Sequence, residues 1–251
     1  MLKTIKHLYF WIKKKYYIYV NIKKNLNILR LLNFNSKYIK YELKKLNYNF
    51  YDQKLSWHYH LFAGFKERLK YEKKIKILEI GTHNGIFAEY LSKLFLNSEI
   101  YTIDLEENDP RFINSYKREN REKRIDFIIK RNLALKNKNI KFIELDSSQL
   151  AQKIFEKRFD LIWIDGDHLN PQVTMDINSC FYLLKDKGIM LCDDVIMKNN
   201  PGFKLSDDSS YKTLKLFEKN RLLFNFFVLK RINQDNNKKK YISISFKNKI
   251  F

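Results

Sequence analysis

The sequence predicts an α/β fold built on a mostly parallel sheet, with a helical segment before it and an antiparallel hairpin at its end. From Ile75 onward, short apolar runs alternate with stretches whose apolar residues recur at helical intervals. Near the C-terminus, residues 222–232 and 240–247 are strand-like and flank the polar turn QDNNKKK. Strands that alternate with helices pair in parallel, because each helix carries the chain back to the start of the next strand.

Each element has its own local signal. Residues 86–95 (IFAEYLSKLF) place their large apolar side chains on one face of a helix. Pro110 follows Asp109 and Pro171 follows Asn170, and a capping residue followed by proline is typical of a helix start. The expected buried strands are short apolar runs bounded by polar or turn residues, at 75–80, 99–104, 140–145, 159–165 and 188–194.

Residues 1–74 form the expected helical N-terminal segment, and residues 75–251 the main domain. Lysines separate Leu, Ile, Tyr and Phe at helical intervals in this segment, as in LNILRLLNF and YIKYELKKL, and its only glycine is Gly64. The basic aromatic stretch HLYFWIKKKYYIYV could lie on an anionic membrane surface as a peripheral contact, or its aromatic residues could be a packing face.

Composition bounds the class of protein. With 45% hydrophobic residues, the chain is too apolar for a disordered protein. The net charge of +21 is compatible with an anionic partner such as nucleic acid, but lysines occur in every segment, as expected from an AT-rich genome. Cys180 and Cys192 match no disulfide or zinc framework. Without a disulfide framework, a reducing cytoplasm is the expected compartment. No apolar run reaches the ~18 residues of a membrane span, so we expect a soluble chain, with a homo-oligomer as one possible assembly.

The stretch ILEIGTHNG joins the first predicted strand to the helix at 86–95. Glu79, Gly81 and Gly85 lie where the strand ends, and glycines there allow a sharp turn and a close approach to a ligand at the helix N-terminus. A plain structural turn is the alternative. The dinucleotide fingerprint has a further glycine where this chain has His83, so the sequence disfavours NAD.

Acidic residues end the next two strands. Asp104, in YTIDLEE, is 19 positions beyond Gly85, and a carboxylate there can accept hydrogen bonds from both hydroxyls of a ribose. Asp146 and Ser147 follow the third strand. Either residue could cap the next helix, and Asp146 could equally contact an adenine ring.

The fourth and fifth strands end in WIDGDH and CDD. In an open parallel sheet these ends face the ligand crevice, so Asp165, Asp167, His168, Asp193 and Asp194 should converge. Carboxylates that crowd together repel one another unless a positive charge lies among them, and a divalent cation with oxygen ligands would supply it. The alternative is that Asp193 and Asp194 face water.

With these motifs in place, the chain resembles the class I methyltransferases that use S-adenosylmethionine, over roughly residues 75–247. WIDGDH and CDDV are similar to motifs of metal-dependent small-molecule O-methyltransferases of the macrocin and novobiocin-sugar type, and of a cephalosporin hydroxylase-like group. The resemblance implies a Rossmann-like fold with a seven-stranded sheet. The chain departs from the family pattern at His83, where many members have glycine, and its N-terminal helices match no family pattern.

The resemblance also implies roles for individual residues. The cofactor S-adenosylmethionine would be bound by Glu79, Gly81, Thr82, His83, Gly85, Asp104, Asp146, Ser147 and Asp165. Asp165, Asp193 and Asp194 match the Mg²⁺ ligands, and Asp167 matches the general base, with His168 as a second candidate.

The leading hypothesis is therefore Mg²⁺-dependent methylation of a hydroxyl on a small molecule, such as a sugar or glycolipid. An RNA-directed methyltransferase and a non-catalytic cofactor-binding protein are the alternatives. The sequence leaves open the acceptor, the position methylated, the oligomeric state and the role of residues 1–74.

Overall fold

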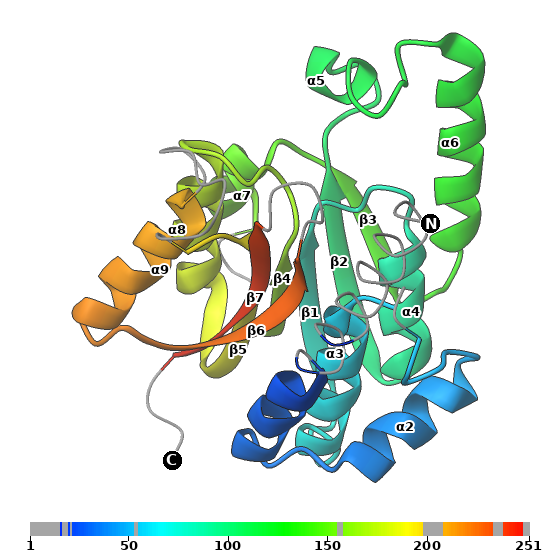
Figure 1. Ribbon diagram of the computed structural model, residues 1–251. Helices are drawn as coiled ribbons and strands as arrows, with labels where there is room; N and C mark the ends of the chain where they lie inside the picture. The colour runs from blue at the N-terminus through cyan, green and yellow to red at the C-terminus, as the bar shows by residue number, and fades with distance from the viewer. Residues whose placement is uncertain are drawn as a thin grey trace, which may run out of the picture. The chain divides into compact units, whose positions relative to one another are not determined.

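The computed structural model describes residues 16, 20, 22–52, 55–154, 158–197, 208–232 and 238–247. Contacts between residues divide the chain into two compact units, Met1–Lys70 and Tyr71–Phe251. The first unit is helical and the second contains the sheet (Figure 1). Most of the stretch HLYFWIKKKYYIYV lies outside the described residues, so its membrane contact stays a prediction.

Among the described residues of the first unit, helical stretches lie at 22–31, α2 (Ser36–Lys45) and α3 (Trp57–Arg68). Asn35 caps α2, because its side chain accepts a hydrogen bond from the backbone N–H of Lys37 at 3.0 Å. The rings of Phe34 and Phe65 meet edge to face, with centroids 4.9 Å apart. The helical character predicted here is therefore confirmed over the described residues, none of whose helices has the length and apolarity to span a bilayer.

The second unit is built on a seven-stranded sheet with the order β3-β2-β1-β4-β5-β7-β6. The first five strands pair in parallel, and β7 pairs antiparallel with both β5 and β6. This confirms the predicted fold class and the C-terminal hairpin. The strands are β1 (Ile75–Ile80), β2 (Ser98–Asp104), β3 (Ile140–Glu144), β4 (Phe159–Ile164), β5 (Leu184–Val195), β6 (Leu223–Ile232) and β7 (Lys239–Lys247).

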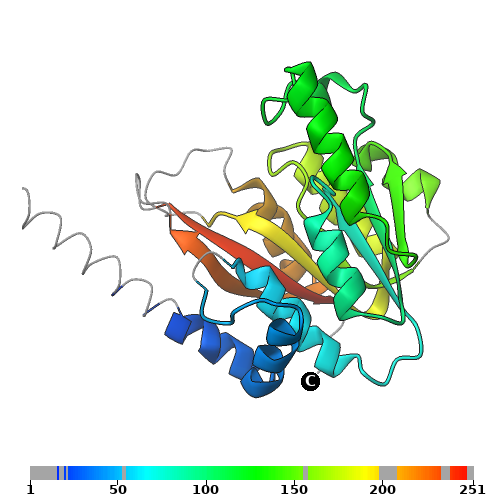
Figure 2. The same ribbon diagram turned by 90° about the vertical axis from the view of Figure 1, so that its right-hand side faces the viewer.

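Helices cover both faces of this sheet, as predicted from the alternation of elements. Figures 1 and 2 show α8 (Gln172–Leu183) and α9 (Ser209–Lys219) on one face and α4 (Ile86–Leu94) on the other. The short helices η1 (Ser147–Gln149) and α7 (Leu150–Lys153) contact α8. Between β2 and β3 the chain forms α5 (Pro110–Ile113) and α6 (Arg121–Ala134), which lie beyond the carboxyl end of β2 in Figure 1.

One helix start differs from its prediction. Asp109 caps α5 as expected, because its carboxylate accepts the N–H of Arg111 at 2.7 Å. Asn170 does not cap α8 in this way. The Asn170–Pro171 peptide is cis, Pro171 itself precedes the first helical residue, and no side chain caps the helix.

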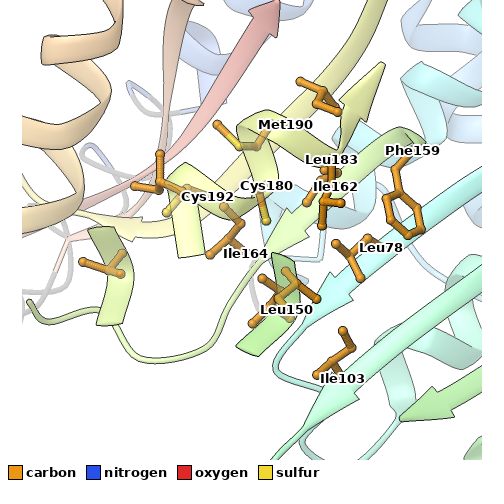
Figure 3. Close-up of a cluster of buried hydrophobic side chains, with 14 of the residues drawn as sticks. Leu78, Ile103, Leu150, Phe159, Ile162, Ile164, Cys180, Leu183, Met190 and Cys192 are labelled. Atoms are coloured by element: carbon orange, nitrogen blue, oxygen red, sulfur yellow. The ribbon is translucent and has the colours of Figure 1, made fainter. Parts of the chain in front are cut away.

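The core lies between the sheet and the α8–α9 layer. Buried side chains of the strands, such as Leu78 of β1, Ile162 of β4 and Met190 of β5, meet those of α8, and Leu150 of α7 lies among them (Figure 3). Cys180 and Cys192 lie in this cluster as free, buried thiols, and burial raises the pKa of each. The core therefore fixes the strand ends that carry the polar residues described next.

Candidate functional site

The candidate site lies at the carboxyl ends of β1, β2, β4 and β5, which end at the same edge of the parallel sheet. The loop after β1 turns sharply at three alternate residues with positive φ, which are Gly81 (94°), His83 (47°) and Gly85 (75°). A Cβ atom on Gly81 would lie 2.2 Å from the carbonyl oxygen of Asp165, so only glycine fits there. The loop is thus wedged against the end of β4.

Glu79 lies at the base of this loop and is 1% exposed. Its carboxyl group accepts a hydrogen bond from the Thr102 hydroxyl, which also lies 2.6 Å from the Thr82 hydroxyl. Burial raises the pKa of Glu79 from 4.5 to about 8, and the charge of Asp104 adds to this, while the Thr102 hydrogen bond opposes it. Glu79 is therefore neutral at pH 7 and supports the loop from below.

Asp104 ends β2 beside the same loop. One carboxylate oxygen accepts the N–H of His83 at 2.7 Å, and the other accepts the N–H of Leu105 at 2.9 Å. These two bonds fix the carboxylate at the edge of the sheet. Each carboxylate oxygen has a second lone pair with which to accept another donor.

Asp146 holds two partners of its own. It accepts the N–H of Ser148 at 2.8 Å as the N-cap of η1, and it forms an ion pair with Arg111 at 2.7 Å. Burial opposes its ionisation, but these hydrogen bonds outweigh it and lower the pKa of Asp146. The capping interpretation therefore describes its geometry, while adenine contact stays a prediction. The hydroxyl of Ser147 accepts a hydrogen bond from Gln172 at 2.7 Å.

Sequence reasoning missed Asp176, which lies on α8 behind this edge. The residue is fully buried, and burial raises its pKa from 3.8 to about 6. Gln172 donates to one carboxylate oxygen at 2.9 Å, whereas the other has no hydrogen-bond partner within the described part of the chain. That free oxygen lies 3.5 Å from where a Cβ on Gly166 would be, next to the end of β4. The sequence pattern of α8 did not indicate that Asp176 would be a buried carboxyl group at this edge of the sheet.

Arg118, which no sequence motif indicated, lies in the loop between α5 and α6. The residue is 5% exposed, and its guanidinium lies 3.8 Å from the ring centroid of Phe112 and 4.7 Å from that of Phe127. The His83 ring also meets Phe127 edge to face, at 5.2 Å. Burial lowers the pKa of Arg118, and the charge of Asp104 opposes that effect. An aromatic and cationic cluster thus adjoins the loop.

The carboxyl groups of Asp165, Asp193 and Asp194 come together as predicted, whereas the exposed Asp167 does not join them, and lysines lie among the carboxylates. The ammonium group of Lys230, on β6, contacts the carboxylate of Asp193 and lies 3.0 Å from that of Asp194. Lys240, on β7, contacts the other oxygen of Asp194. The alternative prediction that Asp193 and Asp194 face water is therefore wrong, since Asp193 is 2% exposed and Asp194 8% exposed.

Two β-bulges make these contacts possible. The pairing of β5 with β7 shifts between Cys192 and Val195, and that of β6 with β7 shifts between Leu229 and Arg231. Both shifts adjoin Tyr241 of β7, which pairs with Val195 on one side and with Leu229 on the other. The bulged residues therefore lie at one level of the sheet.

Asp194 has a φ of 50°, which breaks the alternation of side chains along the strand. As a result, the consecutive residues Asp193 and Asp194 both reach Lys230.

Charges explain the protonation of this cluster. Burial raises the pKa of Asp165 well above its usual value, and the neighbouring Asp193 adds to the shift. Burial also opposes ionisation of Asp194, but Lys230 and Lys240 hold its pKa well below the usual value. Burial disfavours the charged form of Lys230, but the carboxylates of Asp193 and Asp194 raise its pKa. Lys230 is therefore held as a cation.

The two candidates for a catalytic base have different surroundings. The Nε2 atom of His168 lies 3.6 Å from Asp165 Oδ1 and 3.9 Å from Asp194 Oδ2, and burial lowers its pKa although both Asp194 and Asp193 oppose this. Asp167 is exposed, and its carboxylate accepts the N–H of Leu169 at 2.9 Å, as a turn residue does. Only His168 belongs to the charged cluster.

The predicted magnesium ligands fit a metal poorly. Mg²⁺ needs carboxylate oxygens that are free to approach to ~2.1 Å, and three of the four carboxylate oxygens of Asp193 and Asp194 are held by ammonium groups. Within the described ranges, no group of three or more His, Cys, Asp or Glu side chains is arranged to hold a metal ion. The fourth oxygen, Oδ1 of Asp193, is buried and has no hydrogen-bond partner among these residues.

Comparisons with known proteins agree with this architecture. Residues 78–195 match a sequence family described as a methyltransferase domain. No curated protein matches the sequence.

Three solved structures share the fold. A candidate O-methyltransferase from Klebsiella pneumoniae is 14% identical, with a TM-score of 0.54 over 90% of this chain and 97% of that one. A candidate caffeoyl-CoA O-methyltransferase from Staphylococcus aureus is 17% identical, with a TM-score of 0.52 over 94% and 100% of the chains. An O-methyltransferase from Bacillus cereus in complex with S-adenosylhomocysteine is 16% identical, with a TM-score of 0.52 over 92% and 100%.

Proposed function

We propose that this chain, a class I methyltransferase that uses S-adenosylmethionine, transfers the methyl group to a hydroxyl oxygen of a small molecule. The observation that carries the proposal is His168, whose imidazole lies beside the carboxyl group of Asp165, which follows β4, and that of Asp194, on β5. A neutral imidazole held there can accept the proton of a hydroxyl. The similar structures named as O-methyltransferases support the same choice of acceptor atom.

The loop after β1 and the end of β2 fit the cofactor. Alternate positive φ values at Gly81, His83 and Gly85 are typical of loops that turn backbone N–H groups toward an anion, such as the carboxylate of the methionine part. Asp104 retains acceptor capacity for ribose hydroxyls, because its two backbone donors use only part of it. Glu79 and Thr82 would support the loop through Thr102 rather than touch the ligand.

Asp146 and Ser147 would border the adenine side, and Asp165 the far side of the loop. Arg111 and the Ser148 N–H orient the Asp146 carboxylate, so its role would be to shape the pocket edge. The backbone of Asp165 packs against Gly81, which links the cofactor loop to the charged cluster.

The bound cofactor supplies an electrophilic methyl group on a sulfonium centre. The chain's own residues then position the acceptor and remove its proton as the new O–C bond forms. Because Nε2 of His168 faces Asp165 and Asp194, that nitrogen would carry the ring hydrogen, leaving Nδ1 to accept the hydroxyl proton. The resulting imidazolium would be stabilised by the Asp194 carboxylate. No step is assigned to Mg²⁺, because the donor oxygens are held by lysines.

The geometry of the site points to a class of methyl acceptor, small molecules with a hydroxyl group, rather than to one compound. A small hydroxylated molecule such as a sugar or glycolipid suits a half-buried base at a sheet edge, where the His168 side chain is 33% exposed. No contact among the described residues favours nucleic acid over it, and the predicted membrane contact and homo-oligomer remain predictions.

The test is transfer of a radiolabelled methyl group from S-adenosylmethionine to a panel of sugars, polyols, catechols, glycolipids and RNA. We expect alkali-stable label on an oxygen of a small hydroxylated acceptor. Label that enters only RNA, or only nitrogen, would contradict the proposal.

The role of His168 has a separate test with the acceptor so found. His168→Gln should lower kcat by roughly 10²- to 10⁴-fold, because it removes the proton acceptor. Asp167→Asn is the matched control, since its carboxylate only caps the turn through the Leu169 N–H. If Asp167→Asn causes the larger loss in kcat, the assignment of the base to His168 is wrong.

A further inference from the structure

Two lysines from the C-terminal hairpin lie inside the acidic cluster rather than at its rim. The side chain of Lys230 is 13% exposed and that of Lys240 is 25% exposed. By contrast, Arg231 is 58% exposed and reaches Asp194 from outside at 3.4 Å. Burying an ammonium group is costly unless carboxylates compensate it, so these lysines and aspartates depend on one another.

The lysines contact the same oxygens that a metal would need. Lys230 binds Oδ2 of Asp193 and Oδ1 of Asp194, and Lys240 binds Oδ2 of Asp194. A divalent cation bridging these carboxylates would lie within a few ångströms of both ammonium groups and would be repelled by them. The carboxylates of Asp193 and Asp194 already face three cationic side chains, those of Lys230, Lys240 and Arg231, so their two negative charges are compensated without a divalent ion.

We infer that Lys230 and Lys240 replace the divalent cation at this cluster, and that they act as positioning residues which hold the Asp194 carboxylate against His168. The inference concerns binding and so stands apart from the identity of the acceptor, while its catalytic consequence rests on the proposed function. Without a metal to chelate two adjacent oxygens, the acceptor needs only one hydroxyl. A diol or catechol would have no advantage over a single alcohol.

The test measures Mn²⁺ binding to the full-length protein by electron paramagnetic resonance, with Mg²⁺ competition. Four variants are compared with the wild type. The double variant Lys230→Met/Lys240→Met removes both internal cations. The single variant Lys230→Arg keeps a positive charge at its position. Asp194→Asn removes the shared carboxylate. Lys93→Met is the matched control, because Lys93 pairs with a single carboxylate on the surface of α4.

We expect the wild type, Lys230→Arg and Lys93→Met to bind no Mn²⁺ at this cluster, and the double variant to gain one Mg²⁺-competable site. The double variant should also melt at a higher temperature when Mn²⁺ is added, a shift absent from the wild type. Methyl transfer by the wild type should be unchanged by EDTA.

Two results would overturn the inference. One is a wild-type Mn²⁺ site that Asp194→Asn abolishes, and this arm remains decisive even if the double variant does not fold. The other is a folded double variant that binds no Mn²⁺, because the lysines would then not be what keeps the ion out. Neither result depends on finding the acceptor, so failure here is distinguishable from failure of the proposed O-methylation.

Discussion

The neutral state of Glu79 leads to a quantitative prediction about stability and pH. Glu79→Gln replaces a buried carboxyl group with an uncharged side chain of the same shape, which can still accept the hydroxyl hydrogen bond of Thr102. In the wild type, the pKa of Glu79 rises from 4.5 in the unfolded chain to about 8 in the folded protein. The folded protein therefore holds a proton that the unfolded chain loses.

The magnitude follows from this difference. Below pH 4.5 the residue is neutral in both states and has no effect on the pH dependence. Between pH 4.5 and 8 the free energy of unfolding falls by roughly 1.4 kcal/mol for each pH unit, because unfolding releases a proton. Above pH 8 the cost levels off, on the order of 5 kcal/mol in total. Glu79→Gln should remove this term, so it should be increasingly more stable than the wild type as the pH rises toward 8.

The assay is urea denaturation at pH 5, 6, 7 and 8, followed by far-UV circular dichroism, for wild type and variant side by side. The quantity compared is the difference in unfolding free energy at each pH, which cancels contributions from other groups. Glu119→Gln is the control, because it removes a glutamate from an exposed position. Parallel curves for wild type and Glu79→Gln would refute the reasoning, since Glu79 would then be ionised in the folded protein.

Three further substitutions test the site. Gly81→Ala should destabilise the protein by roughly 2–5 kcal/mol in thermal or urea melts. The reason is that its Cβ would lie 2.2 Å from the Asp165 carbonyl oxygen, on a backbone with a φ of 94°. A stability equal to that of the wild type would contradict the observed close approach. Asp104→Asn should weaken S-adenosylmethionine binding about tenfold or more, as measured by calorimetry. The melting temperature should stay nearly constant, because the amide oxygen of asparagine still accepts one backbone N–H. Unchanged affinity would remove Asp104 from the cofactor site. Asp176→Asn should flatten the fall in stability between pH 3.8 and about 6, where the folded protein retains the proton of Asp176, and identical pH profiles would show that this carboxyl is ionised when buried.

Most of the fold could be predicted from the sequence, because its signals are local. The apolar run IKILEI forms β1, and the pattern IFAEYLSKLF forms α4 within one residue of its predicted end. Periodicity and helix-start residues report on neighbours a few positions away, and packing against one sheet preserved them. The start of α8 differs from its prediction, because Pro171 rather than Asn170 precedes the first helical residue and no side chain caps the helix.

Parts of the site were equally accessible from the sequence. The acids at the ends of β1, β2, β4 and β5 lie at one edge of the sheet, because parallel strands all end on the same side. Topology alone therefore predicts that Asp165, Asp193 and Asp194 gather, and the structure has them together.

The partners of those acids were decided by the tertiary structure. Lys230 and Lys240 are 10 positions apart among many lysines, and they meet Asp193 and Asp194 only because bulges in β5 and β6 adjoin Tyr241 of β7 at the same level. A register shift of one residue would turn these side chains to the opposite face. Acidic residues at the ends of predicted parallel strands are visible in the sequence, and they place negative charge at this edge of the sheet. That ammonium groups neutralise this charge follows from the pairing of strands that are distant in the chain.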